Sequence, residues 1–103
     1  MKVVINHTES AIFACGMLFI PGTNVVEDDK FDETKSDAKP FIDGGQLSVK
    51  DTAKMTDKDK NEAVDNVTNR KNLEALEKNV KGVDTSKAKK KLDLLDEQLK
   101  KGA

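Results

Sequence analysis

The sequence predicts an α+β protein in which a small N-terminal unit of strands, a β-hairpin and short helices precedes a C-terminal segment of two to three helices. Apolar residues are concentrated in residues 12–26, whereas those after residue 60 recur at helical spacing. Apolar and charged residues each make up 36% of the 103 residues, so one core cannot extend over the whole length. We therefore predict an α+β unit over 1–50, a polar linker over 51–60 and a helical segment over 61–103.

The N-terminal unit is predicted to begin with a strand at residues 2–5 and to continue, after a polar loop, into a β-hairpin. Two short runs of β-favouring side chains, 12–15 and 17–20, flank Gly16, which can adopt the positive φ that a tight reversal needs. Pro21 and Gly22 then break the second run, because proline lacks an N–H group and glycine suits the third position of a type II turn.

An extended path is expected to resume at Val25 and Val26 and to lead into two short helices and a last strand. Residues 27–35 place acids first and a lysine last, which favours a short helix. Pro40 suits the first position of another helical turn, which Gly44 and Gly45 would end. Residues 46–50 alternate polar and apolar, as in a half-buried strand. The predicted core of this unit comprises Val3, Ile5, Ile12, Phe13, Leu18, Ile20, Val25, Phe31, Phe41, Ile42, Leu47 and Val49.

Three helices are predicted in the C-terminal segment from capping residues and from apolar spacing. Thr56 and Asn69 suit the N-caps of the first two helices, and either Asp84 or Thr85 suits that of the third. Gly82 is expected to end the second helix. The apolar faces comprise Ala63, Val64 and Val67; Leu73, Leu76 and Val80; and Ala88, Leu92, Leu95 and Leu99, broadened by Leu94. These side chains are too few for a stable core, so we expect the helices to pack on the N-terminal unit, on a partner chain or on copies of themselves.

No set of residues spells out a catalytic, cofactor or metal site. Cys15 lies in an apolar run, so a buried thiol is favoured over a nucleophile paired with His7, which is predicted to be a solvated turn residue. The acids of residues 27–33 do not match a calcium loop, because Lys30 and Phe31 stand where ligands or the turn glycine would be. We therefore expect no enzymatic activity, no cofactor, no metal and no small-molecule substrate.

Charge and hydropathy narrow the classes of partner. The formal net charge is −1, and neither half of the chain is strongly basic, which argues against a dedicated non-specific nucleic-acid binder. The apolar runs are too short to span a membrane or to form a secretory signal. We therefore expect a protein that does not bind membranes and that is made in a reducing cytoplasm.

The one basic cluster is formed by four residues of the last predicted helix, Lys87, Lys89, Lys90 and Lys91. A solvated helix face is the favoured interpretation, and contact with nucleic-acid phosphates is the alternative. Aromatic and arginine side chains do not interleave these lysines, so stacking on bases and reading of base edges are not expected. The two helices of residues 73–99, joined by a short extended loop, resemble the helix-extended loop-helix modules of some nucleic-acid-binding and phage proteins.

The N-terminal half carries a second resemblance. Residues 12–26, with the turn Pro21-Gly22-Thr23-Asn24 before a valine, and residues 39–49, with the ending Gly45-x-Leu47-x-Val49, resemble small proteins encoded among the morphogenesis genes of tailed bacteriophages and Mu-like prophages. The resemblance covers about half of the chain and implies no catalytic residue.

This resemblance implies a non-enzymatic structural protein of the virion, associated with the head, neck or capsid and made in the cytoplasm of the bacterial host. Such a protein would bind other virion proteins in a homo- or hetero-oligomeric assembly, with its helical segment docked on a neighbouring subunit. The alternative function is that of a nucleic-acid-binding accessory protein that uses the lysine-rich last helix.

Overall fold

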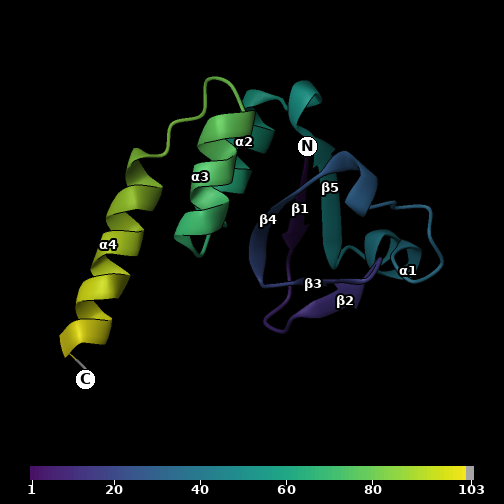
Figure 1. Cartoon of the computed structure of the whole chain (residues 1–103), viewed down its shortest axis with the longest axis horizontal. Coiled ribbons are helices and arrows are strands. Elements are labelled where there is room, and N and C mark those ends of the chain that lie inside the picture. Colours follow the sequence, from purple (N-terminus) through teal and green to yellow (C-terminus); the bar gives the residue numbers. More distant parts are fainter. Residues whose placement is uncertain (102–103) are drawn as a thin grey trace.

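A computed structural model describes residues 1–101 and has the predicted α+β fold (Figure 1). A three-stranded sheet and a separate two-stranded hairpin come first, and the longer helices follow. The elements in chain order are β1 (Lys2–Asn6), β2 (Ile12–Ala14), β3 (Met17–Phe19), β4 (Gly22–Val26), the 3₁₀ turn η1 (Asp28–Lys30), α1 (Lys39–Asp43), β5 (Leu47–Asp51), the 3₁₀ turn η2 (Thr52–Lys54), α2 (Asp57–Asp65), α3 (Arg70–Asn79) and α4 (Ser86–Lys101). No helix in this part of the chain is both long and apolar enough to cross a membrane.

Strand β1 is the centre of the sheet, with β4 and β5 paired antiparallel on its two sides. Because side chains alternate along a strand, Val3 and Ile5 face one side of the sheet and Val4 faces the other. All three side chains are buried, so both faces of the sheet are covered. The helices cover the first face, and the hairpin with residues 27–46 covers the second.

The core consists of two clusters that share the sheet as their common wall. The first cluster joins Val3 and Ile5 to the helices, so of the three expected alternatives the helices pack on the N-terminal unit. Its buried members from the helical segment are Ala63, Val64, Val67, Leu73, Leu76, Val80, Ala88 and Leu92. The second cluster contains Val4, Ile12, Ala14, Phe19, Val26, Phe31, Ala38 and Leu47.

Residues 51–60, predicted to be a polar linker, are folded for most of their length. They contain the end of β5, the 3₁₀ turn η2 and the start of α2. Thr56 caps α2 as expected: its hydroxyl accepts a hydrogen bond from the backbone N–H of Asp59, whose carboxylate accepts one from the N–H of Thr56. This reciprocal capping box fixes where α2 begins.

The hairpin forms where it was predicted, but Phe13 and Leu18 do not belong to the core. The register pairs Ile12 with Phe19 on the inner face and Phe13 with Leu18 on the outer face. Phe13 and Leu18 are therefore 65% and 60% exposed, while Phe19 is buried and packs edge to face on Phe31 with ring centroids 5.2 Å apart. The predicted core combined residues of both faces, Ile12 with Phe13 and Leu18, and omitted Phe19, because the hairpin carries apolar side chains on both faces.

The helix predicted over residues 27–35 is reduced to the single 3₁₀ turn η1. Phe31 follows in an extended conformation, which brings its ring into the second cluster. Asp32 then accepts hydrogen bonds from the backbone N–H (2.9 Å) and the hydroxyl (2.6 Å) of Thr34. Such local side-chain to backbone bonds compete with a helix, which explains why the acidic stretch does not continue as one.

A close backbone approach joins β4 to the connection between α2 and α3. Gly22 has a φ of +92°, and a Cβ atom there would collide with the carbonyl oxygen of Asn66. The N–H of the next residue, Thr23, donates to that same oxygen at 2.9 Å. The N–H of Val25 donates to the side chain of Asn72 at 3.1 Å. These bonds occupy outward donors of β4, which protects this edge of the sheet from pairing with another chain.

Candidate interaction surface

Helix α4 extends beyond the rest of the helical layer (Figure 1). Ala88 and Leu92 in its first half are buried, but Leu95 is 41% exposed and Leu99 is 74% exposed. The predicted apolar face of this helix is therefore buried only in part. Helix α4 has 16 residues and α3 has 10. At 1.5 Å per residue, α4 is therefore longer than α3, and α3 does not cover the last turns of α4.

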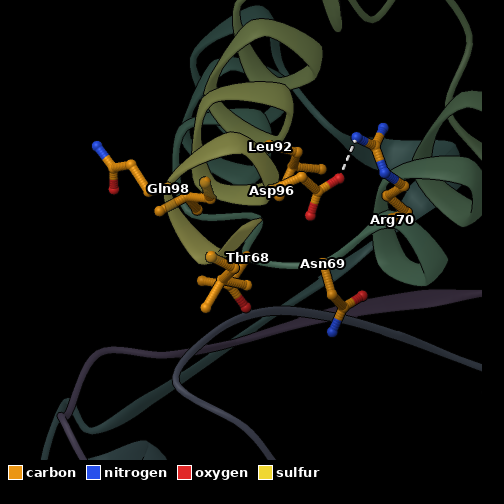
Figure 2. Close-up of a pocket in the computed structure, with 8 residues that line it drawn as sticks. Thr68, Asn69, Arg70, Leu92, Asp96 and Gln98 are labelled. Carbon is orange, nitrogen blue, oxygen red and sulfur yellow. Dashed lines mark hydrogen bonds and ion pairs between the residues drawn. The ribbon is translucent and has the colours of Figure 1, made fainter. Parts of the chain in front are cut away.

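A groove of about 450 Å³ lies beside this exposed end of α4 (Figure 2). Leucine side chains of α4 form one wall, and the connection from α2 into α3 forms the other. The lining residues are Thr68, Asn69, Arg70, Leu92, Leu95, Asp96, Gln98 and Leu99. Because the groove is open to solvent and mainly apolar, it suits a protruding side chain of another protein.

Arg70 holds the two walls of the groove in place. Its guanidinium donates to Asp93 at 2.6 Å and to Asp96 at 2.7 Å, as Figure 2 shows for one of these pairs. The hydrogen bonds with Asp96 and Asp93 raise the pKa of Arg70 above its usual value. A further ion pair, 3.3 Å long, joins Lys89 of α4 to Glu77 of α3. The buried side chains of Ala88 and Leu92 anchor α4, and these solvent-exposed ion pairs add a smaller contribution.

The floor of the groove is fixed by helix capping. Asn69 is the N-cap of α3, as predicted, and its side chain accepts a hydrogen bond from the N–H of Asn72 at 2.8 Å. Asn69 also borders a second hollow, of about 240 Å³, between the N-terminal end of α3 and the hairpin side of the sheet. That hollow is lined by Leu18 and Lys71, among others. Asn69 thus borders both hollows.

The four lysines predicted as a nucleic-acid contact lie on the first half of α4 and are all exposed. Within the described part of the chain, Lys89 is the only one of them within 4 Å of a carboxylate. The connection before α4 was expected to be extended, but it contains a turn at residues 81–82, where Gly82 has a φ of +75°. Helix α3 ends at Asn79, three residues before the glycine that was expected to end it. None of the four lysines lines the groove.

His7 and Cys15 contact different residues. Cys15 is half-buried in the hairpin turn, with its thiol 3.4 Å from the carbonyl oxygen of Asp32. His7 is exposed, as predicted, and its Nε2 lies 2.9 Å from the hydroxyl of Ser48 and 4.0 Å from the carboxylate of Glu62. The pairing of β1 with β5 brings Ser48 near His7, and no local pattern in the sequence signals that contact.

The contacts of His7 do not have the geometry of a catalytic triad. In such a triad the serine and the carboxylate occupy different ring nitrogens, so that the carboxylate orients the base. Here Ser48 and Glu62 approach the same nitrogen. The contacts therefore do not assemble an activated serine.

The carboxylates with altered pKa values act in turns and caps. Hydrogen bonds from Thr34 lower the pKa of Asp32, and those from Ser86 lower the pKa of Asp84. Among residues 1–101, no three His, Cys, Asp or Glu side chains lie close enough to hold a metal ion. Within the described residues, the groove and the exposed leucines beside it form the candidate interaction surface. No protein-family model, curated protein or solved structure matches this chain.

Proposed function

We propose that this protein is a non-enzymatic structural protein of a tailed-phage particle and that it binds neighbouring virion subunits. The observation that carries the proposal is the exposure of Leu95 and Leu99 beside an open apolar groove. Clustered exposed apolar side chains rimmed by polar ones are typical of protein–protein interaction sites. The resemblance of residues 12–26 and 39–49 to phage morphogenesis proteins supplies the setting.

The character of the groove favours a protein partner over a small molecule. Ligand pockets enclose most of their ligand and direct a few polar groups at it. This groove is shallow, and its charged groups, Arg70 and Asp96, already bind each other at 2.7 Å. What remains for a partner is the apolar surface of Leu95 and Leu99, which a side chain from a neighbouring subunit can cover.

The test is quantitative mass spectrometry of purified particles from the phage or prophage that encodes the chain. We expect a fixed copy number relative to the major capsid protein, and that number distinguishes a neck ring from a lattice over the whole shell. Absence from mature particles, together with presence in the producing cells, would refute a structural role. Particles purified by two independent methods control for adsorbed cellular protein.

Nucleic-acid binding is the second candidate, because Lys87, Lys90 and Lys91 are exposed without a carboxylate within 4 Å in the described part of the chain. A mobility shift with duplex DNA over a series of salt concentrations tests it. Changing all three lysines to glutamine would abolish a shift that depends on phosphate contacts. Lys30→Gln, Lys54→Gln and Lys58→Gln together remove the same number of exposed charges elsewhere and serve as the control. A shift unaffected by the first set would exclude these lysines as the contact.

A further inference from the structure

We propose that α4 is a hinged strap that opens away from the fold, turning at Gly82 and held shut by Arg70, while the sheet, α2 and α3 remain folded. The open form is a minor state that exists before any partner binds. The proposal goes beyond a structural role in the virion, because it concerns a motion of the chain itself and holds whatever the protein binds.

Helix α4 is held by few buried side chains. Of its side chains that the structure describes, those of Ala88 and Leu92 are buried and the others are exposed. Both lie in the first half of the helix, and both belong to the cluster that α2, α3 and the sheet share. Figure 1 shows α4 at the edge of the molecule, on the side of α3 away from the sheet. Segments with few buried apolar contacts open at a lower free energy than the fold as a whole.

Ion pairs at the protein surface join α4 to α3. The guanidinium of Arg70 binds the carboxylates of Asp93 and Asp96, and Lys89 binds Glu77. All five side chains are exposed to solvent by more than a third. Such ion pairs are weak and are screened by salt. They therefore latch α4 in the closed position without fixing it there permanently.

The rest of the fold is held together without α4. The hydroxyl of Thr23 in β4 donates to the carbonyl oxygen of Ala63 at 2.6 Å, and its N–H donates to that of Asn66 at 2.9 Å. The N–H of Val25 donates to Asn72 of α3. The cluster on the helix side of the sheet also retains its members from β1, α2 and α3 when the two buried side chains of α4 leave. Removal of α4 therefore breaks none of the bonds that tie α2 and α3 to the sheet.

The connection between α3 and α4 has the form of a hinge. Val80 is buried and its N–H donates to the carbonyl oxygen of Leu76, so the chain is fixed up to this point. The next two residues form an exposed turn, in which Gly82 has a φ of +75°. Glycine changes its backbone conformation at little cost, because it has no Cβ atom. Beyond the turn, the hydroxyl of Thr85 donates to Glu77 at 3.2 Å, and opening at Gly82 breaks this bond.

Opening has two consequences. The apolar side chains of α2 and α3 that share a cluster with Ala88 and Leu92 become exposed to solvent. The free α4 also loses most of its helical hydrogen bonds, because most of the stability of a helix in a protein comes from its tertiary packing. The backbone amides of α4 then exchange their hydrogens with solvent, which makes the opening measurable.

Native-state hydrogen exchange of the full-length chain, resolved by residue with NMR, tests the opening. The conditions are those in which the exchange rate follows the equilibrium population of the open form. In the wild type, the central amides of α4 should exchange faster than those of β1. Their rates should also depend only weakly on low concentrations of urea, because opening of α4 exposes much less surface than unfolding of the whole chain.

Single substitutions distinguish opening of α4 from unfolding of the whole chain. Ile12→Val trims a side chain of the second cluster, which has no member from α4. It should speed exchange in β1 by about 2–10-fold and leave exchange in α4 unchanged, because Ile12 stays packed in the open form. Arg70→Gln removes the latch and should speed exchange in α4 by about 2–10-fold. Lys39→Gln, which breaks an exposed ion pair with Asp43, is the matched control and should leave α4 unchanged.

Equal acceleration of α4 and β1 by Ile12→Val would show that α4 opens only when the whole chain unfolds, and it would overturn the proposal. So would α4 amides that have the urea dependence of β1 in the wild type, a measurement that needs no variant. Exchange in α4 that Arg70→Gln leaves unchanged would overturn the role of Arg70 as the latch. None of these results depends on whether virions contain the chain, so the opening and the proposed function stand or fall separately.

Discussion

Replacing Gly22 with alanine should be among the most damaging single changes in this protein. The φ of +92° is unfavourable for any side chain, which costs about 1–3 kcal/mol. The added Cβ also meets a backbone oxygen, that of Asn66, which cannot rotate away. Moving that oxygen breaks its hydrogen bond with the N–H of the buried Thr23, at a cost of about 1–3 kcal/mol. The sum, about 2–6 kcal/mol, is a large fraction of the roughly 5–15 kcal/mol that stabilises a typical domain.

Urea denaturation followed by circular dichroism measures this loss, and the chain provides two matched controls. Gly16 and Gly45 also have positive φ, +71° and +78°, but a Cβ at either position has no atom within 4 Å. Gly16→Ala and Gly45→Ala should therefore cost only the backbone strain, about 1–3 kcal/mol each, without the loss of the Thr23 hydrogen bond. Equal losses of unfolding free energy at all three positions would show that the carbonyl oxygen of Asn66 can move away without loss of stability. Such a result would refute the proposed close approach.

Three further changes test the helical segment. Leu92→Ala should lower the free energy of unfolding by about 2–5 kcal/mol, because the Leu92 side chain is buried. Leu99→Ala should change it by less than about 0.5 kcal/mol, because Leu99 is 74% exposed. Equal effects of the two changes in urea denaturation would contradict the exposure of the end of α4. Thr56→Ala should cost about 1 kcal/mol through loss of the α2 cap, and thermal melts that match the wild type would contradict the capping box. The hydrogen bonds from Thr56 lower the pKa of Asp59 in the folded state. Their contribution to the free energy of unfolding is therefore present above the unfolded pKa near 4 and is lost as the pH falls through the lower pKa of the folded state. Asp59→Asn should flatten the dependence of stability on pH below about pH 4, and a dependence like that of the wild type would contradict this.

The elements most accessible to prediction were those signalled locally. Thr56 and Asn69 cap helices where expected, because a capping side chain acts within three residues of its own position. The hairpin was also predictable, because Gly16 lies between two β-favouring runs. The choice of its inner face was not, since Phe13 and Phe19 are equally apolar and only contact with the sheet selects Phe19.

The candidate surface could be predicted only in part. The leucine spacing of α4 is visible in the sequence, but the exposure of Leu95 and Leu99 depends on where neighbouring elements end. The groove itself requires Arg70 to reach two carboxylates more than twenty residues away. Such contacts are set by tertiary packing. No periodicity or motif in the sequence signals them.

The central position of β1 imposes an order on folding during synthesis. Its two partners, β4 and β5, come later in the chain. Strand β1 therefore leaves the ribosome before either strand with which it pairs. Until residue 26 has emerged, Val3, Val4 and Ile5 belong to an apolar strand with two unpaired edges, and one of these edges stays unpaired until residue 51 has emerged. Such a segment is a target for chaperones and for aggregation, so slowing translation between β1 and β5 should reduce the yield of folded protein. The side chains of Val3, Val4 and Ile5, which are buried in the folded sheet, are thus also those that expose the nascent chain to aggregation.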